Sequence, residues 1–417
     1  MAILGNKGAG RKYARAVDVK NDEGLRSVLR SALVGFVVDA GVAKFRQILD
    51  DEITALAGPK SKKNPDRTAV RWATAQGAFL LGGRKVPLEY TRLRTKDGRR
   101  EIVPLAAAFA RRTDLLGEHI LSQIFGGLAG SRYRENLQSP EIGYGATRSS
   151  VSRCVAAAGK AALDRLMSRD LSGLKLVAVM IDGLSFAETT VVAALGIDHQ
   201  GLKHPLGVWD GATENATVCK GLLANLIDRG LAFRRGLVVI DGSKALRKAV
   251  RDTWGDDVLV QRCRIHKMRN LLDHLPKKRH GWARRLFWQA MAEKNADRAA
   301  KSLAALGRLL EKESPSAAAS LREGIDELLT TKRLGLPDAI ERAVSTTNLL
   351  ESALAQVRGR TRNIKRWRGG AMILRWAGAA FEHAGKRWNR IRGHREIPFL
   401  LAALDRHFGV VEQAKVA

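Results

Sequence analysis

The chain has 417 residues, of which 45% are hydrophobic, so it can form two or three domains with a sizeable core. Lys and Arg number 72 against 42 Asp and Glu, which gives a formal net charge of +30. Such an excess favours a polyanionic partner, nucleic acid before an anionic membrane surface.

A membrane-bound protein is not expected. The most apolar early stretch, Ser31–Phe45, is interrupted by Asp39 and falls short of the roughly 20 residues that a span needs. The start of the chain also lacks the layout of a signal peptide, so we expect a cytoplasmic protein. The three cysteines, Cys154, Cys219 and Cys263, are too few for a disulfide framework or a Cys₄ zinc site.

The first hundred residues predict a helix followed by a small basic β-element. A basic arm over residues 1–20 precedes a helical pattern over 21–57, and a Pro/Gly/Lys linker covers 58–67. Apolar and polar residues alternate within 77–105, and Asp97-Gly98 is a hairpin signal. We therefore expect N-terminal helices to residue 58 and a linker with a β-hairpin element over 59–103.

Residues 104–170 predict a helical, helix-turn-helix-like DNA-binding domain. Within it, residues 144–167 have a polar start and an Ala-rich body, as in a recognition helix. The residues expected to face DNA are Arg148, Ser149, Ser150 and Arg153. The alternative is an ordinary capped surface helix, and the basic composition favours the DNA-binding interpretation.

The middle of the chain predicts a mixed sheet. Strands are expected over 174–182, 189–198 and 203–211, then a helix over 214–230. A further strand and helix follow over 236–250, and a last strand over 256–266. A three-stranded meander followed by alternating helix and strand is the order of a ribonuclease-H-like fold.

The C-terminal third is predicted to be helical. Residues 267–340 are rich in Ala, Leu and Arg and form an all-α insertion, and helix resumes after Ser345. The fold class is therefore multidomain α+β and α/β. The ribonuclease-H-like catalytic core is expected over 171–266 and 341–405, with a tail over 406–417.

Asp182 and Asp241 are the first candidates for chemistry. Each is expected just past the end of an apolar strand, where sites form in α/β sheets, and each precedes Gly. Either alone is more simply an Asp-Gly turn. Together on a strongly basic chain they predict a pair that Mg²⁺ could neutralise for phosphoryl transfer.

A third carboxylate would complete such a site, and spacing alone does not choose it. The competing acids are Glu188, Asp210, Glu214, Glu341 and Glu351. Glu351 follows Asn348 at capping-box spacing, which favours a helix cap. It also lies on a different stripe from Leu350, Leu354 and Val357, which favours a site role, so both interpretations stay open.

The ordered motifs "MIDGLSF", "VVIDGSKAL", "QRCRIHKMRN" and "STTNLLESALAQVRGRTR" resemble the Mutator-like transposases of bacterial insertion sequences. The upstream "GGRKVPLEYTRLR" and "LSQIFGGLAGSRYRENL" are similar to the N-terminal half of that family. The resemblance covers most of the chain. It implies a ribonuclease-H-like core with an Asp, Asp, Glu triad that maps onto Asp182, Asp241 and Glu351, with two Mg²⁺ ions that Mn²⁺ could replace.

Cys263 and His266 match the Cys-x-x-His motif of the family, and two such residues do not make a zinc site. His266 is expected beside the active site, where it contacts DNA or orients a carboxylate, or else in a structural hydrogen bond. Cys263 is expected in the core. Thr347 and Asn348 match the residues before the family's Glu, and are expected to cap the helix and fix the carboxylate.

Two basic regions are candidates for DNA contact. In the insertion, Arg284 and Trp288 could hold a DNA end, although a Trp here is more simply a packing residue. After Glu351, a basic stretch with Trp367 predicts a phosphate-tracking surface, or else a solvated charged face. Its candidate residues are Arg358, Arg360, Arg362, Lys365 and Arg366.

The sequence therefore predicts a DDE transposase that cleaves its element ends and joins the 3′-hydroxyl to another phosphodiester. Its expected partners are double-stranded DNA, as terminal inverted repeats and target DNA, and a second copy of the chain or more on DNA. A nucleoid-associated location in a bacterial cytoplasm follows. The alternatives are a DNA-binding regulator without catalysis and a ribonuclease-H-like nuclease without strand transfer.

Overall fold

The computed structural model describes residues 23–110, 118, 121–127 and 148–409, apart from 63, 82–83, 187–188 and 212–215. The predicted basic arm, Glu188 and Glu214 lie outside these residues. Contacts divide the chain into two units. The first is Met1–Ile120 with Gly130–Val155, and the second is Leu121–Ala129 with Ala156–Ala417.

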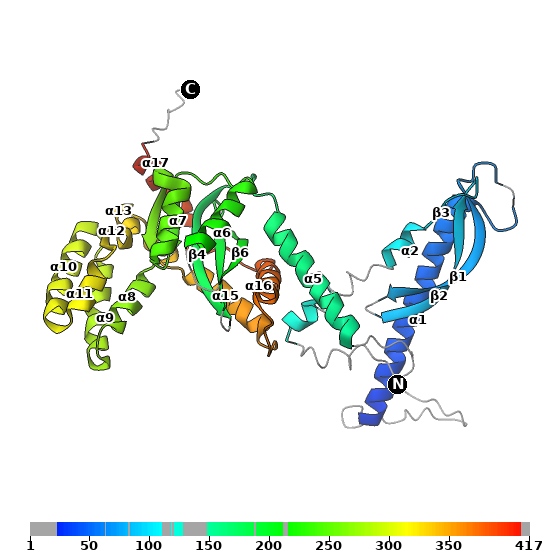
Figure 1. The fold of residues 1–417 in the computed structure, drawn as a ribbon, viewed down its shortest axis with the longest axis horizontal. Helices are drawn as coiled ribbons and strands as arrows, with labels where there is room; N and C mark the ends of the chain where they lie inside the picture. Colours follow the sequence, from blue (N-terminus) through cyan, green and yellow to red (C-terminus); the bar gives the residue numbers. More distant parts are fainter. Residues whose placement is uncertain are drawn as a thin grey trace, which may run out of the picture. The chain divides into compact units, whose positions relative to one another are not determined.

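The first unit contains the predicted helix and β-element, and the structure packs the long helix on the small antiparallel sheet. Helix α1 (Glu23–Ala57) packs on strands β1 (Ala69–Leu81), β2 (Arg84–Thr95) and β3 (Glu101–Ile102), in the order β1-β2-β3 (Figure 1). Their shared apolar cluster consists of Leu49, Ile53, Ala57, Ala69, Leu88, Tyr90, Leu93 and Ala107. The helix thus covers one face of a sheet that could not be stable alone.

The predicted turn at Asp97-Gly98 is confirmed, and the start of β1 was missed. Gly98 has a φ of +72° and donates its N–H to the carbonyl of Thr95 at 2.8 Å. Strand β1 begins eight residues before the predicted β-element, at Ala69. A register shift between Arg71 and Ala73 interrupts the alternation of its side chains, so a two-residue period is hard to see there.

Helix α2 (Leu105–Ala110) is fixed to α1 by one carboxylate. Glu52 accepts the backbone N–H of Leu105 and, at 2.9 Å, that of Ala106. These N–H groups belong to the first turn of a helix and have no partner within it. The contact therefore joins the end of the β-element to the long helix.

The second unit is built on a five-stranded mixed sheet in the order β6-β5-β4-β7-β8. Strands β4 (Leu176–Phe186), β5 (Thr189–Asp198) and β6 (Lys203–Gly211) form the predicted antiparallel meander. Strands β7 (Gly236–Ile240) and β8 (Val258–Arg262) run parallel to β4. The last strand is shorter than expected, because the chain enters a helix at Arg264.

Helices cover both faces of this sheet. One face packs on α6 (Ala216–Asp228) and α7 (Lys244–Trp254) through a cluster that includes Val179, Ile181 and Ile240. Alternate residues of β4, such as Met180 and Asp182, point to the opposite face. There, α15 (Asn348–Thr361) contacts β4, and α16 (Gly370–Gly385) contacts β5 and β6.

The remaining helices complete the unit. Helix α5 (Arg148–Ser168) buries Ala158, Ala162 and Leu166, and it contacts α16 where Leu163 lies against Gly378. Helix α17 (Ile397–His407) ends the described chain after the 3₁₀ turn His394–Glu396. Among the described helices, none is both long enough and apolar enough to cross a bilayer.

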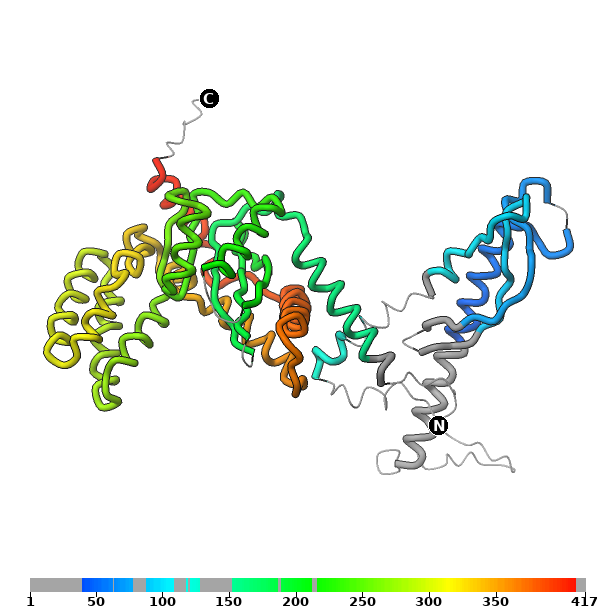
Figure 2. Tube along the Cα trace, viewed as in Figure 1, coloured from blue at the N-terminus to red at the C-terminus, as the bar shows by residue number. Residues whose placement is uncertain are grey.

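A helical bundle is inserted between β8 and α15. Figure 2 shows the chain leaving the sheet into this bundle and returning at α15. Its helices are α8 (Arg264–Asp273), α9 (Lys277–Ala292), α10 (Ala296–Glu313), α11 (Pro315–Arg322), α12 (Ile325–Leu328), α13 (Thr330–Arg333) and α14 (Asp338–Val344). The bundle has its own apolar core, which includes Phe287, Leu303 and Leu321.

Substitutions at two neighbouring residues of α9 should distinguish a residue that packs in the bundle core from one that lies at the surface. Phe287 is fully buried and Trp288 is 36% exposed. We expect Phe287→Ala to lower the free energy of unfolding by about 3–5 kcal/mol, because it leaves a cavity in the bundle core. Trp288→Ala, the matched control, should cost less than about 1 kcal/mol. Denaturant unfolding would measure both, and equal losses would contradict this account of the core.

Candidate active site

Asp182 and Asp241 are adjacent because β4 and β7 pair in parallel. The last parallel pair is Ile181 with Ile240, and each aspartate is the next residue in its strand direction. The prediction that Asp182 lies past the end of its strand is wrong. β4 continues to Phe186, and Asp182 pairs with Ala193 of β5. The Asp-Gly turn interpretation is therefore excluded for Asp182.

The two aspartates have different surroundings. Asp182 is 6% exposed, and the N–H of Gly183 donates to its Oδ1 at 2.8 Å. Asp241 is half-buried, and its Oδ1 accepts the N–H of Ser243 at 2.8 Å at the start of α7. The chain leaves β7 through Gly242, whose φ of +102° favours glycine. Asp241 is thus held at the edge of the sheet by a tight turn.

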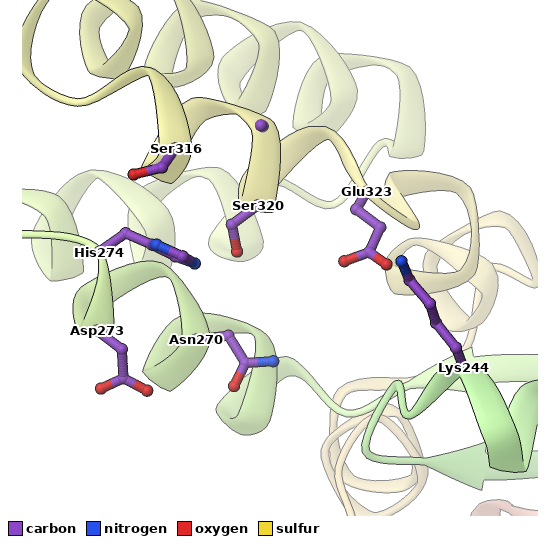
Figure 3. A pocket seen from close by; sticks show the side chains of 8 residues that line it. Lys244, Asn270, Asp273, His274, Ser316, Ser320 and Glu323 are labelled. Atoms are coloured by element: carbon purple, nitrogen blue, oxygen red, sulfur yellow. The ribbon is translucent and has the colours of Figure 1, made fainter.

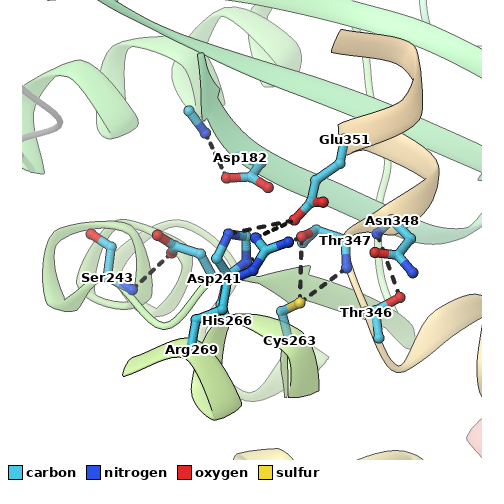
Figure 4. Close-up of polar contacts among 11 residues, drawn as sticks. Asp182, Asp241, Ser243, Cys263, His266, Arg269, Thr346, Thr347, Asn348 and Glu351 are labelled. Atoms are coloured by element: carbon cyan, nitrogen blue, oxygen red, sulfur yellow. Dashed lines mark hydrogen bonds and ion pairs between the residues drawn. The ribbon is translucent and has the colours of Figure 1, made fainter. Parts of the chain in front are cut away.

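Glu351 reaches this edge from α15. Leu350, Leu354 and Val357 form the buried face of the helix, as predicted, and Glu351 projects from another side. One ligand atom each of Asp182, His266 and Glu351 lie within 4.8 Å of one another. Figure 4 shows Asp241 beside this group. Segments separated by more than 100 residues of sequence thus meet at one place.

Two cationic side chains of α8 face Glu351. The Nε2 of His266 and the Nη1 of Arg269 each lie 3.5 Å from Glu351 Oε1 (Figure 4). Sequence reasoning named His266 and missed Arg269. The available signal was the spacing of three residues, which puts both side chains on one face of a helix.

Thr347 and Cys263 connect the elements beneath the site. The N–H of Thr347 donates to Cys263 Sγ at 3.3 Å, and its hydroxyl lies 3.4 Å from His266 Nδ1. Cys263 is fully buried, as predicted, and its N–H donates to the carbonyl of Ile240 at 2.7 Å. This chain of contacts joins the end of β7 to the starts of α8 and α15.

The surroundings of the site shift the pKa values of its titratable side chains. Burial raises the pKa of Asp182 to about 6, and the charge of Asp241 adds to this while that of His266 opposes it. The hydrogen bond with Cys263 raises the pKa of His266 to about 9, although burial opposes it. Asp182 and Glu351 also raise the pKa of His266, so the imidazole is protonated at neutral pH.

Burial raises the pKa of the Cys263 thiol, but its hydrogen bonds with His266 and Thr347 outweigh burial, so the net pKa is lowered. Hydrogen bonds to the thiolate stabilise the thiolate, and they therefore lower the pKa of this fully buried thiol. Cys263 therefore helps to stabilise the protonated form of His266.

Asn348 does not join this group. The residue before α15 is Thr347, no side chain caps the helix start, and Asn348 is its first helical residue. The prediction that Asn348 caps the helix is therefore wrong. Its N–H points to Thr346 Oγ1 at 3.4 Å, and its exposed side chain lines a separate pocket.

Other candidates for the third acid are placed elsewhere. Glu341 Oε1 accepts from Arg264 at 2.6 Å and lies 3.3 Å from Lys332 Nζ, so two cations already neutralise it. Asp210 lies near Gly370 and is not among the carboxylates that gather around His266. Of the described acids in that competition, Glu351 is the one beside Asp182.

The predicted DNA-contacting residues are mostly exposed. The exposed ones are Arg153, Arg284, Trp288, Arg358, Arg362, Lys365 and Arg366. Arg360 differs, because it is half-buried and its Nη1 donates to the carbonyl of Gln356 at 3.2 Å. The side chains of Arg148, Ser149 and Ser150 lie outside the described residues, although α5 begins at Arg148.

A polar groove lies between the first turn of α7, α8 and α11 (Figure 3). Its polar lining includes Lys244, Asn270, His274 and Ser320, together with the acids Asp273 and Glu323. The groove has a volume of about 480 Å³. Its mixed charge gives no preference for an anion or a cation.

The carboxylates fit a divalent cation. Asp182 and Glu351 offer oxygen ligands within 4.8 Å, and Asp241 is close enough to Asp182 for like-charge repulsion to raise the pKa of Asp182. Mg²⁺ prefers such oxygens to imidazole nitrogen. His266 is therefore better suited to orient Glu351 than to bind Mg²⁺.

Asp182→Asn should stabilise the protein in the absence of divalent cations. The folded pKa of about 6 lies above the unfolded value, so the ionised carboxylate destabilises the fold in full above pH 6; this penalty shrinks as the pH falls from 6 towards the unfolded pKa and is gone below it. At pH 7.5 with EDTA, the gain should be about 1–3 kcal/mol in denaturant unfolding. Exposed Asp256→Asn, the matched control, should change little, and a less stable Asp182→Asn would refute the assignment.

Comparison with known proteins identifies relatives. A family model described as "Transposase, Mutator family" matches residues 27–391. A probable transposase for an insertion sequence element of Corynebacterium diphtheriae is 32% identical over 44% of this chain and 52% of that protein. The transposase for insertion sequence element IST2 of Acidithiobacillus ferrooxidans is 28% identical over 51% of this chain and 71% of that protein.

The transposase for insertion sequence element IS6120 of Mycolicibacterium smegmatis is 27% identical over 58% of this chain and 76% of that protein. The match spans about half the length of the Corynebacterium relative. The family match is far more extensive and includes every residue of the carboxylate site. Since it covers residues 27–391 of 417, the chain belongs to the Mutator family of transposases.

Proposed function

We propose that this chain is a DDE transposase that cuts DNA at the ends of its insertion sequence and joins the freed 3′-hydroxyl to another phosphodiester. The observation that carries the proposal is the meeting of Asp182 and Glu351 next to Asp241, on a chain with a net charge of +30. Family membership supports DNA as the substrate.

The catalytic core is proposed to be ribonuclease-H-like. The strand order β6-β5-β4-β7-β8, an antiparallel meander followed by two parallel strands, supports this. The two aspartates then belong to the first and fourth strands, and Glu351 belongs to the helix that returns from the all-α insertion. In such sheets, sites form outside the carboxyl ends of the parallel strands.

In this mechanism, Asp182, Asp241 and Glu351 would hold two Mg²⁺ ions, for which Mn²⁺ could substitute. The bound ions would activate the attacking oxygen and stabilise the leaving oxygen of an in-line displacement. The chain orients the three carboxylates through the β4–β7 register and the buried face of α15. No covalent protein–DNA intermediate is required.

His266 and Arg269 would position Glu351 rather than react. Their nitrogens lie 3.5 Å from its Oε1, and the hydroxyl of Thr347 lies 3.4 Å from the other ring nitrogen of His266. The protonated imidazole keeps three like-charged carboxylates close together before DNA arrives. Both cations also add positive charge where a scissile phosphate would approach.

The proposed partners are terminal inverted repeats and target DNA, held by at least a dimer because two element ends must be processed. The exposed Arg358, Arg362, Lys365 and Arg366 follow Glu351 and are suited to the phosphate backbone. Arg153, Arg284 and Trp288 are further candidates. Arg360 is less available, since part of its side chain is buried.

Neutral substitutions in the triad should abolish the chemistry and spare DNA binding. We expect Asp182→Asn, Asp241→Asn and Glu351→Gln each to reduce 3′-end cleavage and strand transfer by at least about 10²–10³-fold, as loss of key electrostatic groups does. The assay is gel analysis of labelled duplexes that carry the terminal repeats of the element, with Mg²⁺.

Asp210→Asn is the matched control, because Asp210 is an acid of the same sheet outside the cluster. It should retain activity within about threefold, a loss that corresponds to less than about 1 kcal/mol. Full activity in the three triad variants would exclude the proposed site. DNA binding without cleavage by the unsubstituted chain would favour the regulator alternative.

Divalent ions should be required for cleavage and should also stabilise the fold. Mg²⁺ or Mn²⁺ should restore cleavage after EDTA treatment and raise the melting temperature, because ligands that bind only the folded state stabilise it. The rise should be absent in Asp182→Asn. Cleavage that persists in EDTA would rule out the proposed metal-dependent mechanism.

A further inference from the structure

A second pocket lies at the start of α15, on residues that the proposed chemistry does not use. It has a volume of about 600 Å³. Its lining comes from β6, α14, α15 and the loop after α16, and consists of Lys203, Ala339, Arg342, Ala343, Asn348, Leu349, Arg390, Ile391 and Arg392. Four of these residues are cationic and none is acidic, which suits an anion.

The positive charge of this pocket is not neutralised by any carboxylate in the described part of the chain. Among the residues that the structure describes, no ion pair involves Lys203, Arg342, Arg390 or Arg392. Lys203 is half-buried, and burial lowers its pKa. Its Nζ lies 5.9 Å from the centroid of the Trp388 ring, a weak cation–π contact, so an anion would still compensate this partly desolvated cation for its lost water. The arginines are exposed, so an incoming anion can reach them.

The loop that presents two of the arginines is tightly packed. Ile391 is 2% exposed and donates its N–H to the carbonyl of Gly201 at 2.9 Å. Gly393 has a φ of +81°, and a Cβ there would lie 2.8 Å from the backbone of α14. The carboxylate of Glu396 also accepts the N–H of Ile340 at 2.9 Å. The backbone of Arg390 and Arg392 is therefore fixed against α14 and the β5–β6 turn.

The N-terminus of α15 adds further positive potential to this pocket. No side chain caps this 14-residue helix, and Asn348 and Leu349 of its first turn line the pocket. The N–H of Asn348 donates to Thr346 Oγ1, so it is the helix dipole that favours an anion at that position. By contrast, the groove of Figure 3 is lined by two acids, Glu323 beside Lys244 and Asp273 at the other end. Charge therefore distinguishes the two sites.

We propose that the pocket at the start of α15 binds a phosphate of the DNA backbone, and this rests on the proposed action on DNA. Arginine guanidinium groups bind phosphate oxygens through paired N–H donors, and the fixed backbone of Arg390 and Arg392 lowers the entropic cost of presenting them. A polymer suits the site, because the three arginines are exposed and the whole chain is strongly basic.

The pocket and the carboxylate site share a helix. Glu351 follows Asn348 by three residues, so their backbones are separated by about 4.5 Å along the helix axis. DNA anchored at the helix start is thereby held at a set distance from Glu351. The pocket positions the backbone and leaves the reacting phosphate to the carboxylates.

The test is binding of labelled duplex DNA in EDTA, where no cleavage interferes. We expect Arg342→Gln/Arg390→Gln/Arg392→Gln to weaken binding about tenfold and to lower the slope of log K against log salt by about one to two, as loss of one or two phosphate contacts does. The equal-charge control is Lys301→Gln/Arg308→Gln/Lys312→Gln on exposed positions of α10. It should change affinity by less than twofold.

A single substitution tests the same site without removing arginines. Asn348→Asp puts a carboxylate in the first turn of α15, where it favours the helix but repels phosphate. We expect about fivefold weaker DNA binding, a loss of about 1 kcal/mol. Asn295→Asp is the matched control, because Asn295 is the exposed N-cap of α10. It adds the same charge at another helix start and should leave affinity unchanged.

Equal effects in the pocket and control variants would overturn the proposal. Inorganic phosphate provides a second arm, because it should compete with DNA for the unsubstituted chain. If phosphate stabilises that chain but the triple variant binds DNA normally, the pocket holds a small phosphate and the DNA assignment is wrong. Failure of cleavage in every condition would overturn the proposed function alone, since this binding assay requires no chemistry.

Discussion

The parallel pairing of β4 with β7 is the constraint on which the candidate site depends. Four consecutive pairs, ending with Ile181 and Ile240, set the register so that the next residue of each strand is an aspartate on the same face. The opposite face buries both isoleucines against α6 and α7. The hydrophobic core therefore fixes which way Asp182 and Asp241 point, and the acids need no specific contact of their own to be aligned.

This alignment creates an electrostatic cost that other parts of the fold reduce. Asp182 is buried beside a second carboxylate, and Glu351 is brought to the same place by the apolar face of α15. His266 and Arg269 come from α8, the first helix of the inserted bundle. The insertion thus supplies positive charge to the sheet that it interrupts, in addition to any role in holding DNA.

The sequence predicted this arrangement unevenly. Long apolar runs ending in Asp identified both aspartates, because buried parallel strands leave that pattern. The extension of β4 beyond Asp182 was missed, since Gly183 and Ser185 interrupt the run and pairing with β5 maintains the strand. Local spacing made Asn348 a cap and left Glu351 undecided. The helix stripe of Glu351 allowed a site role, and the two aspartates together with the family resemblance favoured it, because no local pattern encodes contact with a strand about 170 residues earlier.

The register of β4 also has an evolutionary consequence. Side chains alternate between faces, so inserting or deleting one residue before Asp182 would turn it into the cluster under α6 and α7. The bundle between β8 and α15 has its own core, and it contacts the sheet through α12 and α13, which lie against β8. Selection should therefore remove insertions and deletions from β4 and tolerate them in the turns between the bundle helices. Related elements should differ in length mainly in that bundle, while the strand segments around both aspartates keep a constant length.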